Sequence, residues 1–128
     1  MSTLSGNKYN LEMWQGATFS MVITVKDANA NVQNLTSYTA RMQLRTSYDA
    51  AAATESLTTS NGEIVITAAE GNVSVELAAS RTANIPVVLT NGVPPKTTYV
   101  YDLELVDGGG KVSKLLYGNV DVYGEVTR

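Results

Sequence analysis

Asp102 and Glu104 are the two residues whose type and spacing best suit catalysis in this sequence. Many glycoside hydrolases use a pair of carboxyl groups about 5–10 Å apart, and residues two apart on a β-strand share a face. The tyrosines and leucines of the same stretch, at 97–107, fall on the opposite face, which is the one expected to pack. Asp102 and Glu104 are therefore predicted to lie on a solvated outer face. The same argument applies to Asp121 and Glu125.

A second pattern is that of a calcium-binding loop. The stretch "DANAN" places Asp27, Asn29 and Asn31 at the spacing of the first three ligands of an EF-hand. Val32 stands where that loop needs glycine, and Tyr38 stands where it needs a bidentate glutamate. The pattern therefore predicts an Asn-rich turn and no metal site.

Two reactive residue types are missing altogether, because the sequence has no histidine and no cysteine. This removes the usual general base, the commonest metal ligand, thiolate nucleophiles and disulfides. The triple glycine at 108–110 lies between two predicted strands, so it lacks the helix N-terminus that would bind a phosphate. We therefore expect no enzymatic activity, no cofactor and no metal.

The alternation of apolar and polar residues that dominates the chain is typical of β-strands. Strands are expected at 9–14, 17–26, 38–45, 62–67, 72–77, 97–107, 111–118 and 119–127, with a short one near 56–59. The strands at 17–26 and 38–45 are expected to form a hairpin around the Asn-rich turn, and Gln15-Gly16 to form the preceding turn. The strands at 62–67 and 72–77 are expected to form a second hairpin, and the triple glycine to close a third between 97–107 and 111–118.

The remaining segments are expected to be loops or single helical turns. Residues 47–56 are predicted as a loop or one helical turn, and 80–86 as a helical turn with Ser80 as its N-cap. About eight to nine strands without a long helix predict an all-β fold: a single antiparallel β-sandwich of immunoglobulin-like appearance. A closed barrel is the competing architecture.

Length and charge restrict the possible partners. The chain has 128 residues, which fits one domain spanning 1–128. Its net charge is -3 and its basic residues are scattered, which argues against nucleic acid. No apolar run approaches the roughly 20 residues that span a bilayer, and the first ten residues lack the apolar core of a signal peptide. We expect a soluble protein with no membrane association.

The aromatic residues are the best candidates for contacts with a partner. Seven tyrosines against one phenylalanine favour rings with a polar group, the type enriched at interfaces. Many of these tyrosines are expected simply to line the edge of the core, with the hydroxyl group reaching water. Trp14, beside a predicted turn, and Tyr48, in a predicted loop, are the stronger candidates. A carbohydrate-binding role by ring stacking is an alternative use of such residues.

Three stretches in a fixed order resemble small virion proteins of tailed phages: "WQGATFSMVITVKDANANVQNLTSYTARMQLR", "GEIVITAAEGNVSVELAASRTANIP" and "YVYDLELVDGGGKVSKLLYGNVDVYGEVTR". The resemblance runs from about Leu11 to Arg128. Among such proteins, the best understood in architecture is the N-terminal β-sandwich of upper baseplate proteins, which anchors receptor-binding machinery to the phage tail. Gly124 departs from the proline that is usual before Glu125. The chain ends at "EVTR", where longer relatives continue into a fibre or coiled coil, which favours an adaptor.

The resemblance implies a structural protein of the virion, assembled in the bacterial host cytoplasm. Its expected role is that of a tail or baseplate component or adaptor that docks neighbouring subunits or receptor-binding fibres. The expected partners are other virion structural proteins and further copies of the chain. A capsid decoration protein and a carbohydrate- or receptor-binding module are the alternatives. The predicted interface residues are Tyr9, Trp14, Tyr48, Tyr123 and Arg128, with the N-terminal strand and the C-terminus joining neighbours.

Overall fold

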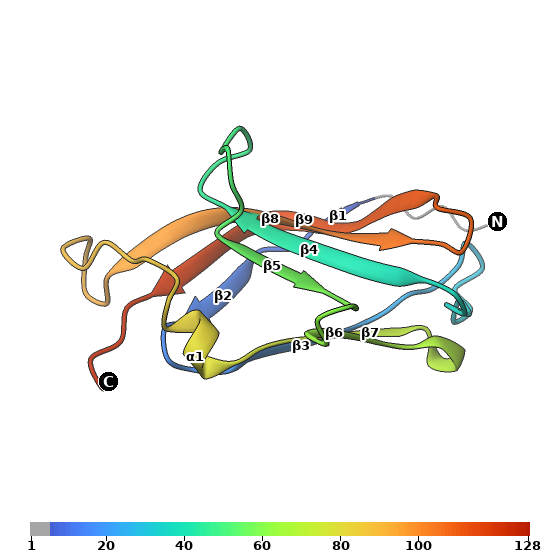
Figure 1. Cartoon of the computed structure of the whole chain (residues 1–128), viewed down its shortest axis with the longest axis horizontal. Helices are drawn as coiled ribbons and strands as arrows, with labels where there is room; N and C mark the ends of the chain where they lie inside the picture. The colour runs from blue at the N-terminus through green and yellow to red at the C-terminus, as the bar shows by residue number, and fades with distance from the viewer. Residues whose placement is uncertain (1–5) are drawn as a thin grey trace.

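The computed structural model describes residues 6–128 as two β-sheets that pack face to face (Figure 1). This confirms the prediction of an all-β sandwich. The described residues form nine strands, in agreement with the expected number. The helical content of residues 6–128 is limited to one 3₁₀ turn, η1 (Ala68–Glu70), and one helical turn, α1 (Ala79–Thr82).

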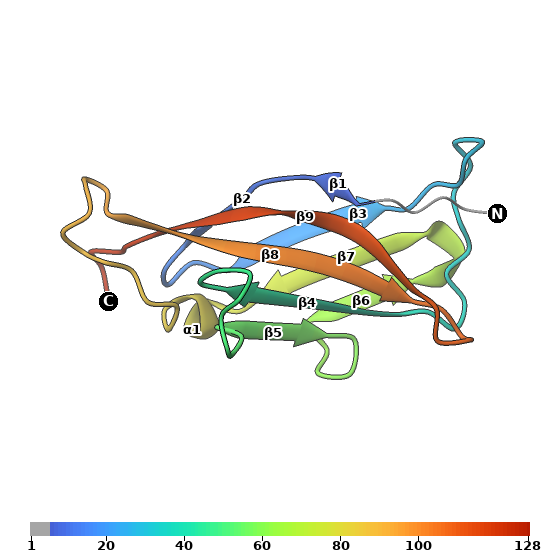
Figure 2. The same ribbon diagram turned by 90° about the horizontal axis from the view of Figure 1, so that it is seen from above.

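The two sheets differ in size and cover different parts of the chain (Figure 2). The large sheet has the order β1-β9-β8-β4-β5, with β2 also paired to β9. Its strands are β1 (Asn7–Lys8), β2 (Leu11–Trp14), β4 (Thr39–Arg45), β5 (Glu55–Thr58), β8 (Lys96–Val106) and β9 (Val112–Tyr123). The small sheet has the order β3-β7-β6 and consists of β3 (Phe19–Thr24), β6 (Ile64–Thr67) and β7 (Asn72–Leu77).

The core lies between the sheets and follows the period-two alternation of the strands. In β4, Ala40, Met42 and Leu44 are buried while Arg41 and Gln43 are exposed. The same alternation continues in the facing strands. Other fully buried side chains are Met13, Leu57, Ile64, Val73, Leu77, Leu103 and Leu105. The predicted inward faces of 38–45 and 97–107 are therefore confirmed.

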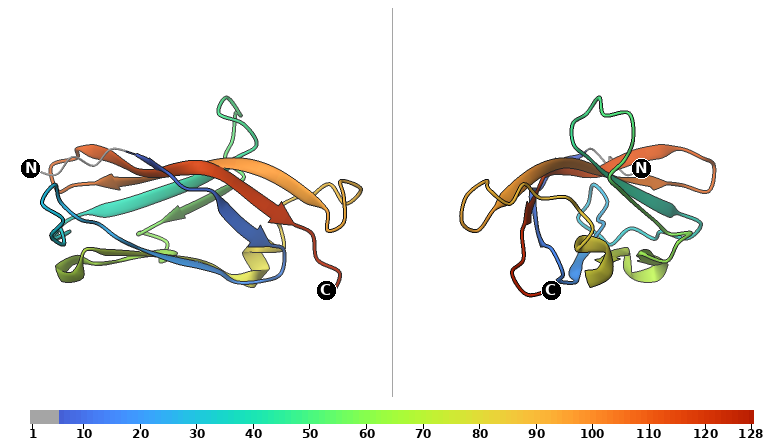
Figure 3. Two further views of the ribbon diagram at one scale, coloured as in Figure 1. Left: turned by 180° about the vertical axis from the view of Figure 1, so that it is seen from behind. Right: turned by 60° about the vertical axis from the view of Figure 1, so that its left-hand side comes forward.

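The N-terminal strand differs from the prediction because it is broken and pairs in parallel. The expected strand at 9–14 is divided into β1 and β2, and both pair with β9 in parallel, whereas every other strand pair is antiparallel. Figure 3 shows β2 running beside β9 toward the C-terminus. Gly118 permits the close approach, because a Cβ there would lie 2.7 Å from the carbonyl oxygen of Tyr9. Tyr101 Oη donates a hydrogen bond to the same oxygen, at 2.6 Å.

The predicted hairpin of 17–26 and 38–45 is wrong, because β3 belongs to the small sheet and β4 to the large sheet. The Asn-rich turn forms, but it closes only a bridge between Lys26 and Val32. The chain then crosses between the sheets, burying Val25 and Leu35 in the core. The turn at Gln15-Gly16 likewise carries the chain from the large sheet to the small one. Burial of apolar residues between the layers thus overrides the local hairpin signal.

Two further boundaries are corrected. The expected strands at 111–118 and 119–127 are one strand, β9, which ends at Tyr123. A register shift opposite Leu103 and Glu104 leaves Leu115 and Leu116 both buried, so the alternation is interrupted without a turn. The helical turn begins earlier than predicted, with Ala78 and not Ser80 at the N-cap. The pair 62–67 and 72–77 does form an antiparallel hairpin, as expected.

Candidate functional site

One end of the sandwich carries a concentration of exposed apolar side chains. The loop between α1 and β8 and the segment after β9 lie together at this end (Figure 1). Gly124 N donates to Pro95 O at 2.9 Å, and a Cβ on Gly124 would lie 3.0 Å from Leu89 Cδ2, so the two segments are in contact. We name this surface the end patch; it comprises the exposed Trp14, Val88, Leu89, Val93 and Val126 and the half-buried Tyr123.

The structure brings two of the predicted interface residues together at this end. Trp14 and Tyr123 are partners in the register of β2 and β9, and their rings are stacked with centroids 4.5 Å apart. Trp14 remains 43% exposed. Arg128 lies beyond the same end of β9, where its guanidinium donates to the carbonyl oxygen of Glu125 at 3.0 Å.

Tyr9 and Tyr48, the other predicted interface residues, lie elsewhere. Tyr9 stands in the break between β1 and β2, at the edge of the large sheet, and is 57% exposed. Tyr48 belongs to the loop 46–54, which rises over the outer face of the same sheet (Figure 1), and is 74% exposed. The five predicted residues therefore do not form one surface.

The outer face of the large sheet carries charged residues in opposite pairs. Arg41 Nε donates to Glu104 Oε1 at 2.9 Å, and Lys114 Nζ donates to Asp102 Oδ2 at 2.9 Å. The predicted outward orientation of Asp102 and Glu104 is confirmed by these pairs. The hydrogen bond from Lys114 to Asp102 raises the pKa of the Lys114 ammonium, and the neighbouring Glu104 and Tyr48 add to the rise.

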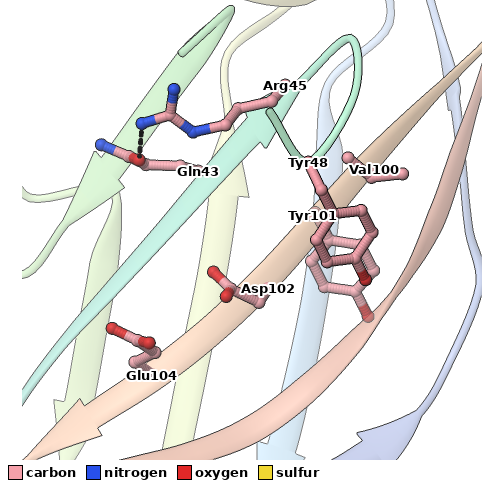
Figure 4. A pocket seen from close by; sticks show the side chains of 7 residues that line it. All are labelled: Gln43, Arg45, Tyr48, Val100, Tyr101, Asp102 and Glu104. Carbon is pink, nitrogen blue, oxygen red and sulfur yellow. Dashed lines mark hydrogen bonds between the residues drawn. The ribbon is translucent and has the colours of Figure 1, made fainter. Parts of the chain in front are cut away.

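A shallow hollow of about 230 Å³ lies on this face beneath the loop 46–54. Figure 4 shows Gln43 and Arg45 of β4 on one side and Asp102 and Glu104 of β8 on the other. Tyr48 projects over it from the loop. The sequence pointed to Tyr48 and to the two carboxylates separately, but only the pairing of β4 with β8 shows that they line one depression.

The other acidic candidates have structural partners. Asp27 Oδ1 accepts hydrogen bonds from the backbone N–H groups of Asn29 and Asn31, at 2.9 and 3.0 Å, as expected for an Asn-rich turn. Asp121 Oδ1 accepts from Thr98 Oγ1 at 2.7 Å. Glu125 packs its carboxylate against Gly16, where a Cβ would lie 1.9 Å from Glu125 Oε2.

Two polar residues next to each other in α1 were missed by the sequence reasoning. Arg81 forms ion pairs with Glu55 of β5 and with Glu63, the second at 2.5 Å, and so links the helical turn to both sheets. The hydrogen bond with Glu55 raises the pKa of Arg81. Thr82 is fully buried, and its hydroxyl accepts from Gly16 N and donates to Ala17 O. No local pattern marks such pairs, because their partners lie far away in the sequence.

The apolar loop of the end patch was also missed, although the sequence carried a signal. In "NIPVVLTNGVPP" three apolar residues follow one another between prolines, without the alternation of a strand. In a loop such a run has no neighbouring strand to cover it, so Val88 and Leu89 are 58% and 56% exposed.

The described part of the chain offers neither a cluster of metal-binding side chains nor a membrane-spanning helix. Across residues 6–128, acidic side chains do not gather in threes or more at a distance suited to a metal ion. The helices of this part are too short and too polar to cross a membrane. In the comparisons with known proteins, no family model matched the sequence and no curated protein matched it.

Proposed function

We propose that this chain is a structural protein of a tailed-phage virion, a tail or baseplate component or adaptor that docks neighbouring subunits and catalyses no reaction. The observation that carries the proposal is the end patch. Exposed apolar side chains gathered at one end of a protein support a contact with another protein there. The patch combines a stacked aromatic pair with fully exposed valines, Val93 and Val126, and aromatic residues are enriched at such contacts.

The strand order gives the proposal a second support. The order β9-β8-β4-β5 facing β3-β7-β6 is the order G-F-C-C′ facing B-E-D of immunoglobulin-like sandwiches. This agreement supports the proposal of an immunoglobulin-like topology, with β2 in parallel beside the last strand. An all-β sandwich is also the fold that the resemblance to upper baseplate proteins implies.

The edges of the large sheet supply a further docking element in this proposal. β1 and β2 each pair only with β9 among the described strands, so their other sides offer backbone N–H and C=O groups to a neighbour. The edge reaches the end patch at Trp14. A neighbouring subunit seated there would contact both the apolar side chains and the strand edge.

The role of the end patch is tested by the sedimentation of the purified protein over a range of concentrations, alone and with the other virion proteins encoded beside it. We expect concentration-dependent association that Val88→Glu abolishes, because a charge cannot be buried at an apolar contact without a partner. Val65→Glu is the matched control, since Val65 lies on the small sheet and is 56% exposed. A monomer at all concentrations and with every partner would refute the docking role.

The location is tested by immunogold electron microscopy of particles from the phage genome that encodes the chain. Labelling at the tail tip or baseplate is the expected result. Labelling of the capsid surface would favour the alternative of a decoration protein. Purified particles without the chain would exclude a virion role altogether.

A further inference from the structure

The hollow beneath Tyr48 is held in a fixed shape by the residues around it. Arg45 Nη1 donates to Ala50 O at 2.9 Å, which ties the loop 46–54 to the end of β4. Thr54 N donates to Leu44 O at 2.7 Å, and Ser47 Oγ donates to Asp49 Oδ1 at 2.7 Å. A loop with these internal bonds presents Tyr48 without a large ordering cost on binding.

The hollow combines an aromatic ring with planar polar groups. Tyr48 is 74% exposed, so its ring is accessible to a ligand, and an aromatic face attracts polarised C–H groups. Gln43 accepts from Arg45 Nη2 at 2.9 Å and donates to Ser56 Oγ at 3.1 Å, so its amide is oriented. The intramolecular hydrogen bonds of the described chain engage Oδ2 of Asp102 and Oε1 of Glu104, which leaves the second oxygen of each carboxylate to accept from a ligand.

The charged side chains around the hollow already have partners within the chain, and this selects the kind of ligand. Arg45 donates to Ala50 O and to Gln43 Oε1. Lys114 neutralises Asp102, and Arg41 neutralises Glu104. An anionic ligand would face two carboxylates, and a cationic ligand would compete with basic side chains already in place. A neutral ligand with many hydroxyl groups can instead donate to the carboxylate oxygens without disturbing either pair.

We propose that this hollow binds a neutral saccharide. One pyranose ring lies with its C–H face on Tyr48, and its hydroxyl groups donate hydrogen bonds to Asp102 and Glu104. The hollow is open and shallow, so it accommodates one or two residues of a longer glycan and leaves the rest in solvent. The site lies on the outer face of the large sheet, apart from the end patch, and binding there does not depend on the proposed docking role.

The test is an array of immobilised oligosaccharides probed with the full chain coupled to beads, followed by saturation-transfer NMR with the glycans that bind. The array contains neutral hexose and N-acetylhexosamine oligomers together with sialylated and sulfated glycans. We expect binding to neutral glycans and a loss of about tenfold or more in affinity for Tyr48→Ala, as for other contact aromatics. Tyr48→Phe keeps the ring and is expected to retain binding.

Two control variants separate this site from other surfaces. Tyr9→Ala removes another exposed tyrosine outside the hollow, and Val88→Glu alters the end patch; neither is expected to change glycan binding. The proposal is overturned if no neutral glycan binds, if only acidic glycans bind, or if Tyr48→Ala binds as well as the unaltered chain. Because Val88→Glu acts on association alone, failure of the saccharide site and failure of the docking role are distinguishable.

Discussion

Tyr99 and Tyr101 use the polar part of the tyrosine side chain inside the core. Both rings are buried between the sheets, and their hydroxyl groups donate to the carbonyl oxygens of Pro86 and Tyr9. Burial raises the pKa of both phenols above the usual value, and for Tyr101 the nearby Tyr9 adds to the rise. Both residues were predicted on the packing face of 97–107, and their burial confirms that prediction.

The raised pKa values predict a loss of stability in alkali. The folded state holds these phenolic protons more tightly than the unfolded state, whose tyrosine pKa is about 10. The stability that they contribute is therefore complete below pH 10 and falls as the pH rises above it. Ultraviolet titration of tyrosinate is expected to show a late phase that coincides with unfolding by circular dichroism. Tyr101→Phe should remove part of this phase; a titration completed while the chain is still folded would contradict the prediction.

The turn at 27–31 was predicted correctly, but its left-handed residue, Ala30, is not one of the expected residue types. The turn at 27–31 was predicted because Asp and Asn tolerate a left-handed backbone, yet it is Ala30 that adopts φ of 64°. The bonds of Asp27 to the backbone of Asn29 and Asn31 determine the turn, and Ala30 must follow. The residue types predicted the turn, whereas the bonds of Asp27 determine which residue adopts the left-handed conformation.

Replacement of Ala30 by glycine is expected to stabilise the protein. Glycine adopts a left-handed conformation without the steric cost that alanine has, so Ala30→Gly should raise the free energy of unfolding by about 0.5–1 kcal/mol. Ala28→Gly is the control in the same turn and should lower it slightly, because it only adds freedom to the unfolded chain. Urea denaturation measures both changes. A lower midpoint for Ala30→Gly would rule out the left-handed assignment.

Single elements were predicted well from the sequence, and so were pairs of strands joined by a short turn, whereas the pairing of β3 and of the N-terminal strand was not. The alternation in β4 and β8 depends only on neighbouring residues, so both the strands and their buried faces could be expected. The pairing of β3 depends on which layer buries Val25 and Leu35, and no local turn signal contains that information. The consecutive burial of Leu115 and Leu116 at a register shift likewise made one strand resemble two.

The contact of α1 with the turn after β2 is an element-scale feature that rests on one hydroxyl group. Thr82→Val keeps the shape of the side chain but leaves Gly16 N and Ala17 O without their bonding partner. The expected cost is about 1–3 kcal/mol in the free energy of unfolding, the penalty of unsatisfied buried polar groups. Thr82→Ser keeps the hydroxyl and should be closer to the original. Equal unfolding midpoints for Thr82 and Thr82→Val would show that these bonds contribute nothing.

At the scale of the whole molecule, the sandwich keeps its proposed activities on separate surfaces. The end patch and the strand edge lie where β2 and β9 end. The hollow beneath Tyr48, proposed to bind a saccharide, lies on the charged outer face between β4 and β8. Sequence reasoning named five interface residues without assigning them to surfaces, because it had no means of placing Tyr9, Tyr48 and Trp14 relative to one another. Their separation follows from the parallel pairing of β2 and from the loop 46–54, both of which depend on the complete fold.

The N-terminal strand completes the sandwich, although it is short. Leu11 and Met13 are buried in the core, and β2 covers the edge of β9 over the length of four residue pairs. A chain that begins at Gln15 would lose both side chains, each worth about 2–5 kcal/mol when truncated in a core, and would expose the edge of β9. We expect this shorter chain to be unfolded or aggregated, as measured by circular dichroism and light scattering.

A synthetic peptide of residues 6–15 should restore the folded signal by adding the missing strand, while the same peptide with Met13→Glu should not. A shortened chain that melts at the same temperature as the full one would mean that β2 is not part of the stable core.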